Sequence, residues 1–188
     1  QRALLEDRID VAVHSLKDLP STLPEGLTIG AVGQRLDARD VLIDRWGCSL
    51  EELPPGARIG TSSPRRSAQL KSLRPDVEAT PIRGNVDTRL RKAKGPDYDG
   101  TVLAAAGVIR MGAEDQIAET LSTEDFVPAP GQGALAMEAR ADDSEMLNLL
   151  QALDHGPTRR DVTGERAFLQ AVGGGCMVPV GAYVRSDG

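Results

Sequence analysis

A short run of hydroxyl and guanidinium side chains, from Gly60 to Arg66, carries the most distinctive chemistry in this sequence. Gly60 allows a tight turn, and Ser62 or Ser63 can cap a helix. Pro64 suits the first helical position, where its missing N–H would be unpaired anyway. Free N–H groups at the helix start and two adjacent guanidiniums would then point at one spot, which favours a carboxylate or phosphate ligand.

The arginine pair lies within a longer basic stretch. Residues 58–94 hold ten Lys or Arg and three acids, in a chain whose formal net charge is −6. Cations gathered in this way within an acidic protein indicate a localised anion site. The alternative for the pair alone is a solvated face of an amphipathic helix. The hydroxyl-rich turn before it, with Arg83-Gly84-Asn85 and Arg89 after it, favours the anion site.

A nucleic-acid-binding domain is another use for the basic stretch, and it predicts an affinity that falls steeply with salt. The sequence pI near 5.0 and an aromatic content of 3% argue against it, because single-strand binders need stacking platforms beside a basic groove. No window approaches about 18 consecutive apolar residues, so the sequence predicts no membrane span.

A second constellation follows a strand-like run, in the segment His14-Ser15-Leu16-Lys17-Asp18. Asp18 can stabilise a developing cation, or give a proton to an amine and take it back. The alternative is a structural Asp that pairs with Lys17 or caps a turn. A nucleophilic pair of Ser15 and His14 has less support, because no strand–Gly-x-Ser-x-Gly–helix turn surrounds the serine. Neither histidine of the chain has a second metal ligand at helical or hairpin spacing, so we expect no metal site.

The two cysteines have different surroundings. Cys176 follows three glycines, so its thiol can be accessible and can carry a covalent group. The alternative is a small buried hydrophobe, which is our interpretation of Cys48. Two cysteines form no disulfide framework and lack zinc spacing, so we expect a reducing, cytoplasmic setting.

Hydrophobic patterning predicts strands that alternate with helices. Val41-Leu42-Ile43 and Arg58 to Thr61 indicate strands, as do 77–82 and 178–184. Helices are expected from Pro64 to about Leu73, after a cap at Asn85, and from Pro157 to Val172. This alternation predicts an α/β fold built from βαβ units with mostly parallel sheets.

Five segments together resemble the porphobilinogen deaminase family, in the family's order along the chain. They are Val13-His14-Ser15-Leu16-Lys17-Asp18-Leu19-Pro20, Gly60-Thr61-Ser62-Ser63-Pro64-Arg65-Arg66, Arg83-Gly84-Asn85-Val86-Asp87-Thr88-Arg89-Leu90, Pro130-Gly131-Gln132-Gly133-Ala134 and Gly174-Gly175-Cys176-Met177-Val178-Pro179-Val180-Gly181.

The resemblance implies a transferase of porphyrin and heme biosynthesis, with hydroxymethylbilane synthase activity. Such enzymes join porphobilinogen head to tail into a linear tetrapyrrole and release ammonia. They do so on a dipyrromethane cofactor, which the resemblance places in thioether linkage to Cys176. Asp18 becomes the catalytic carboxylate. The resemblance implies that the cofactor is bound by Ser15, Lys17, Thr61, Ser63, Arg65, Arg66, Arg83, Gln132 and Cys176. It implies that substrate is bound by Ser62, Arg83 and Arg89.

The resemblance also implies domains of the periplasmic-binding-protein type (type II), followed by the start of an α+β third domain. Residues 1–33 and 134–152 would be a partial domain 1, 39–127 domain 2, and 156–188 the start of the cofactor-bearing domain 3. The sequence would then be truncated at both ends, and this chain by itself could be inactive. We expect a monomer that acts on porphobilinogen, with no nucleic-acid or membrane partner. The remaining alternative is a non-catalytic module of the periplasmic-binding type that binds dicarboxylates or other anions.

Overall fold

The computed structural model describes residues 1–173 and 179–185, and its contacts divide them into two compact units. Unit 1 comprises Gln1–Leu36 with 129–173 and 182–185. Unit 2 comprises Asp37–Pro128 with 179–181. The expected division into a partial domain 1, a domain 2 and the start of a domain 3 stays a prediction.

Unit 2 contains a five-stranded sheet in the order β5-β4-β6-β3-β7. Its strands are β3 (Asp40–Asp44), β4 (Arg58–Gly60), β5 (Glu78–Thr80), β6 (Gly100–Ala104) and β7 (Glu119–Thr120). Its helical segments are α2 (Pro64–Leu73), α3 (Val86–Ala93), α4 (Ala105–Arg110) and the short η2 (Glu114–Gln116).

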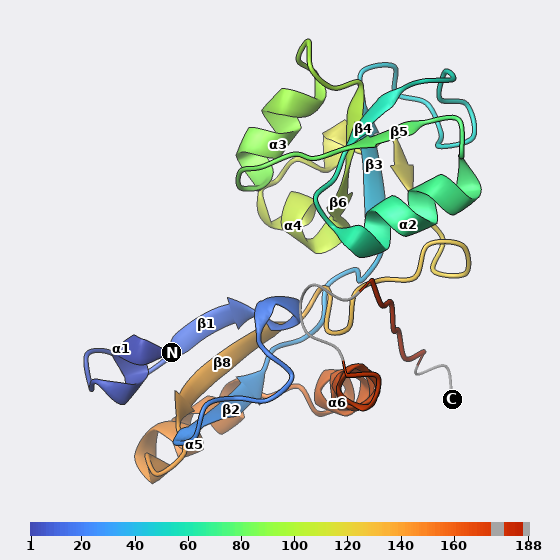
Figure 1. Cartoon of the computed structure of the whole chain (residues 1–188). Helices are drawn as coiled ribbons and strands as arrows, with labels where there is room; N and C mark the ends of the chain where they lie inside the picture. The colour runs from blue at the N-terminus through green and yellow to red at the C-terminus, as the bar shows by residue number, and fades with distance from the viewer. Residues whose placement is uncertain (174–178, 186–188) are drawn as a thin grey trace. The chain divides into compact units, whose positions relative to one another are not determined.

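The side chains of β3 alternate between two apolar layers of unit 2. Leu42 belongs to a cluster that includes Leu70 of α2, and Val41 belongs to a second cluster with Leu90 of α3 and Val108 of α4. Successive side chains of a strand point to opposite faces, so α2 covers one face of the sheet while α3 and α4 cover the other. Figure 1 shows this three-layer arrangement within the unit.

Unit 1 contains a three-stranded sheet in the order β1-β8-β2. Its strands are β1 (Ala12–Ser15), β2 (Leu27–Val32) and β8 (Leu135–Arg140), and its helical segments are α1 (Arg2–Leu5), η1 (Leu16–Asp18), α5 (Ser144–Leu150), η3 (Gln151–Leu153) and α6 (Gly156–Ala171). One core cluster packs Val162 of α6 against Val32 and Leu16. Another packs Leu150 of α5 against the sheet.

Strand directions correct the expectation of mostly parallel sheets. Among the strands of the described residues, β4 alone pairs in parallel, with β5 and with β6. β3 runs antiparallel to β6 and β7, and β8 runs antiparallel to β1 and β2. Helical crossovers such as β4-α2-β5 make neighbouring strands parallel. β3 and β8 are instead the first strands after the chain passes from one unit to the other, so no crossover sets their direction.

Helix starts agree with the sequence predictions. Ser63 is the N-cap of α2 and its side chain accepts from Arg66 N, with Pro64 at the first position. Asn85 Oδ1 accepts from Thr88 N at 2.9 Å and caps α3. The strand expected over 178–184 is wrong for its described part, since 179–185 form no strand. Within the described residues, none of the helices combines the length and the apolar character that crossing a membrane requires.

Candidate functional site

A cavity of about 510 Å³ opens in unit 2 beside the residues that follow β4 and β5. The two strands are parallel, with Gly60 opposite Thr80, so their carboxyl ends lie at the same edge of the sheet. Ligands of open α/β sheets bind at this edge. The cavity is lined by Thr61, Ser62, Pro64, Ser67, Ala79, Pro81, Ile82, Arg83, Gly84 and Arg89.

Close approach of the two strand-end loops shapes this cavity. A Cβ on Gly60 would lie 2.9 Å from Ile82 Cδ1, so a larger residue there would require the Ile82 side chain to shift. Gly84 has a φ of +124°, a conformation that side chains with a Cβ rarely adopt. Thr61 Oγ1 accepts from Ser63 N at 3.2 Å, and the Ser62 hydroxyl bonds to the backbone of Ile82. The described bonds of these hydroxyls are therefore to the loops themselves.

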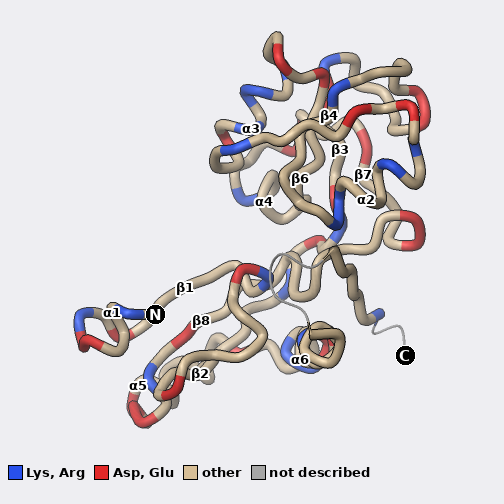
Figure 2. The backbone as a smooth tube through the Cα atoms, in the orientation of Figure 1, with Lys and Arg blue, Asp and Glu red and all other residues tan. Residues whose placement is uncertain are grey.

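Two of the expected arginines line the cavity. Arg89 is partly buried, and its Nε donates to Gly84 O at 2.8 Å, which holds the side chain against the loop after β5. Burial lowers the pKa of Arg89, and the charge of Arg66 lowers it further. Arg83 is exposed at the mouth, and its carbonyl accepts from Lys92 Nζ at 3.1 Å. Figure 2 marks the basic residues of α2, α3 and the loops of this unit.

The arginine pair is buried and does not line the cavity. Side chains of Arg65 and Arg66 are 6% and 8% exposed, and both form ion pairs with the fully buried Asp40. The sequence analysis missed Asp40. Asp40 stands directly before the apolar run 41–43, which was expected to be a strand. An acid at the start of a buried strand needs a cation as partner, so this position was the signal available in the sequence.

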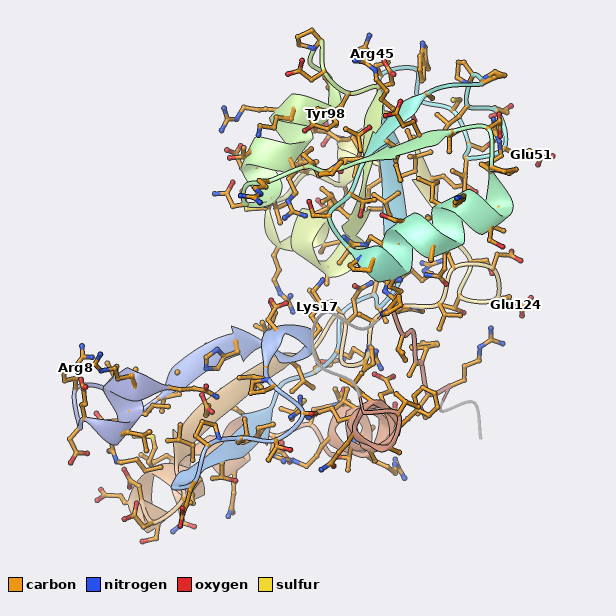
Figure 3. All side chains as sticks on the ribbon, viewed as in Figure 1. Arg8, Lys17, Arg45, Glu51, Tyr98 and Glu124 are labelled. Carbon is orange, nitrogen blue, oxygen red and sulfur yellow. The ribbon has the colours of Figure 1, made fainter. Side chains whose placement is uncertain are left out.

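A second group of expected residues gathers in unit 1. β1 and β8 are antiparallel with Ser15 opposite Leu135, so the segment leaving β1 lies beside the segment entering β8. Leu16 N donates to Ala134 O at 3.0 Å across this edge. Lys17, labelled in Figure 3, donates from Nζ to Oε1 of the buried Gln132 at 3.2 Å. Asp18 is exposed at the end of η1.

The expected residues thus form two groups, one in each unit. Ser15, Lys17, Asp18 and Gln132 belong to unit 1, whereas Thr61, Ser62, Ser63, Arg65, Arg66, Arg83 and Arg89 belong to unit 2. Cys176 lies outside the described residues. The His14 ring faces a carboxylate that the sequence analysis did not single out, with Nε2 2.9 Å from Oε2 of the buried Glu138.

Comparison with known proteins assigns the chain to a family. Residues 1–148 match the model described as porphobilinogen deaminase, dipyromethane cofactor binding domain. The chain belongs to the porphobilinogen deaminase family. It is 54% identical over 188 residues to porphobilinogen deaminase of Alkaliphilus metalliredigens (strain QYMF), covering 100% of this chain and 60% of that protein. It is also 54% identical over 184 residues to porphobilinogen deaminase of Geobacillus kaustophilus (strain HTA426), covering 97% and 60%. The chain therefore spans about 60% of the length of these curated relatives.

Solved structures confirm the periplasmic-binding-protein type of fold expected for this family. A nutrient-binding protein from Burkholderia cenocepacia, bound to methionine, matches with a TM-score of 0.56 at 12% identity, covering 85% of this chain and 77% of that one. A putative methionine-binding lipoprotein from Bacillus subtilis matches with a TM-score of 0.54 at 13% identity, covering 85% and 76%. At such low identity these matches concern the fold alone.

Proposed function

We propose that this chain carries cofactor- and substrate-binding parts of a hydroxymethylbilane synthase. The enzyme joins porphobilinogen head to tail, releases ammonia, and holds the growing chain on a dipyrromethane in thioether linkage to Cys176. The observation that carries the proposal is the cavity after β4 and β5, where two arginines meet three hydroxyl residues in a chain of this family.

The donor set of unit 2 fits a pyrrole that bears carboxylates. Each porphobilinogen unit carries an acetate and a propionate, so an oligomer accumulates negative charge. Arg83 and Arg89 line the cavity, and guanidinium forks bind carboxylates through paired N–H donors. Arg65 and Arg66 are opposed by the carboxylate of Asp40, which offsets a single positive charge of the two. The surplus positive charge favours an anionic ligand.

In unit 1, Asp18 is proposed to act at the reacting end. Its carboxyl group, when protonated, gives a proton to the departing amine, and the carboxylate that remains stabilises the positive charge that develops on the pyrrole. Lys17, the residue before Asp18, is joined to Gln132 by a hydrogen bond, so it is held in place beside the proposed catalytic carboxyl group. When bound, the dipyrromethane supplies the pyrrole to which the first substrate unit is joined. We further propose that the enzyme is a cytoplasmic monomer that binds no nucleic acid.

Intact-mass spectrometry tests this function against the alternative of a non-catalytic dicarboxylate-binding module. Protein that contains this chain is incubated with porphobilinogen and compared with its Cys176→Ser and Cys48→Ser variants. We expect a covalent mass increase matching a dipyrromethane in the parent and in Cys48→Ser, and none in Cys176→Ser. An unmodified thiol together with reversible dicarboxylate binding would favour the module instead.

A further inference from the structure

A single buried carboxylate holds both members of the arginine pair. Asp40 is the first residue of β3 and is 0% exposed. Its Oδ1 accepts from Arg66 Nε at 3.0 Å and from Arg66 Nη2 at 2.6 Å. Its Oδ2 lies 2.8 Å from Arg65 Nη2. Each oxygen therefore serves one guanidinium.

This arrangement needs an explanation, because adjacent residues of a helix point about 100° apart. Arg65 and Arg66 would normally diverge from the first turn of α2. Asp40 instead draws both guanidiniums to one point at the end of the sheet. Arg65 is fixed further by a bond from Nη1 to Val127 O at 2.6 Å and by the ring of Phe126, whose centroid lies 5.9 Å from Cζ.

The charges of the cluster do not cancel. Two guanidiniums face one carboxylate, so the buried group keeps a net positive charge. Burial lowers the pKa of Arg65, the charge of Asp40 opposes this, and the charge of Arg66 adds to the lowering. The pKa of Arg89 is also lowered, mainly by burial and to a smaller extent by the charge of Arg66. Arg89 lines the cavity, so one charge of the cluster, that of Arg66, acts on a residue of the site.

The donors that remain define what a ligand can use. Asp40 occupies the Nε and Nη2 edge of Arg66, and Nη1 of Arg66 has no hydrogen-bond acceptor within residues 1–173 and 179–185. A guanidinium fixed along one edge presents its other N–H groups in a constant direction, which favours a carboxylate over a less directional anion.

We propose that Asp40 is a positioning residue of this anion site: it fixes the orientation of Arg65 and Arg66 and leaves one net positive charge for a ligand carboxylate. The proposal rests on the proposed function for the identity of that ligand, an acidic pyrrole. Asp40 acts through the arginines and does not itself touch the ligand.

The sign of the change in affinity separates this role from two simpler ones. Asp40→Asn removes a negative charge near an anion site, so a purely electrostatic role predicts tighter binding. A role in folding alone predicts unchanged binding by the folded protein. Positioning predicts weaker binding, by about tenfold or more, although the site has become more positive.

The experiment measures the Kd of porphobilinogen by calorimetric titration of protein that contains this chain and carries Cys176→Ser, so that the ligand is not joined covalently, under conditions where each variant is folded. Asp99→Asn is the matched control, since it removes another carboxylate of unit 2 that pairs with arginine, at 3.1 Å from Arg58. We expect its Kd to stay within about twofold of the parent value. Unchanged or tighter binding by Asp40→Asn overturns the proposal.

Two additions keep the test decisive. Asp40→Asn leaves two buried cations unopposed and should lower Tm by roughly 10 °C. If it fails to fold, Asp40→Glu takes its place, because it keeps the charge but shifts the carboxylate by one methylene. Positioning predicts weaker binding there too, and unchanged binding overturns the proposal. If the parent does not bind porphobilinogen, the proposed function fails, and citrate as a polycarboxylate probe tests Asp40 by the same comparison.

Discussion

Ser62 and Ile82 exchange two hydrogen bonds, one in each direction. Ser62 Oγ donates to Ile82 O at 2.7 Å and accepts from Ile82 N at 3.1 Å. One hydroxyl thereby joins the loop after β4 to the loop after β5, and both loops line the cavity of unit 2. The substrate contact expected of Ser62 stays a prediction. Its described bonds give it a role in setting the spacing of the two loops.

Replacing Ser62 by Ala should therefore affect both stability and binding. The N–H and C=O of the buried Ile82 lose their partner, which should lower the free energy of unfolding by about 1–2 kcal/mol. Urea unfolding measures this change. Ser67→Ala is the control, because Ser67 lines the same cavity without joining the loops. Equal effects of the two substitutions would show that the exchange of hydrogen bonds does not matter.

Arg89→Leu should weaken the binding of porphobilinogen by at least about tenfold, because a charge-assisted hydrogen bond contributes roughly 1.5–3 kcal/mol. Steady-state kinetics or calorimetric titration gives the value. Arg91→Leu is the matched control on the same helix, since Arg91 is exposed and pairs with Asp87 at 2.9 Å. The role of Arg89 in binding a substrate carboxylate is rejected if both variants bind and extend the pyrrole chain normally.

Asp18→Ala should leave folding intact and reduce turnover by orders of magnitude. Asp18 is exposed, so its removal creates no cavity, whereas the loss of a group that stabilises developing charge commonly costs about a hundredfold or more. Turnover and the circular dichroism spectrum are measured together. Glu25→Ala, which removes another exposed carboxylate of unit 1, should keep full activity. Near-normal turnover in Asp18→Ala would remove Asp18 from the mechanism.

Acid should weaken unit 2 partly through Asp99. Its hydrogen bond from the Arg58 side chain, 3.1 Å from Nε to Oδ2, and that from the Arg58 backbone hold its pKa below the ordinary value. A lowered folded-state pKa adds stability above the unfolded value near pH 4 and loses it as the pH falls through the folded value.

We therefore expect the difference in stability between the parent and Asp99→Asn to shrink as the pH falls from about 5 to about 2. Urea unfolding across this range measures it. Arg58→Met should remove only the part that the Arg58 side chain contributes, because the backbone N–H of residue 58 still donates to Asp99. Adding Asp99→Asn to Arg58→Met should then remove the remainder. A difference that stays constant with pH would contradict the role of this pair.

The sequence predicts local structure well where short-range chemistry decides it. Ser63 before Pro64 and Asn85 before Val86 are helix starts in both the sequence analysis and the structure, because a cap needs only the next few residues. The gathering of Thr61, Arg83 and Arg89 around one cavity follows from the parallel pairing of β4 and β5, which the alternating elements predicted.

Longer-range relationships were not predictable in the same way. The ion pairs of Asp40 join residues from separate elements, and local propensity carries no information about which cation a buried acid will meet. The antiparallel directions of β3 and β8 depend on how the chain passes between the two units, which periodicity does not encode. The roles of the site residues, including the thioether at Cys176, stay predictions.

The most direct test is a crystal structure of protein that contains this chain with its pyrrole cofactor attached. The account predicts carboxylates of the pyrroles within about 3 Å of the guanidiniums of Arg83, Arg89 or Arg66, beside the ends of β4 and β5. Pyrrole carboxylates that lie in solvent, with this cavity empty and no arginine of the cluster in contact, would contradict it.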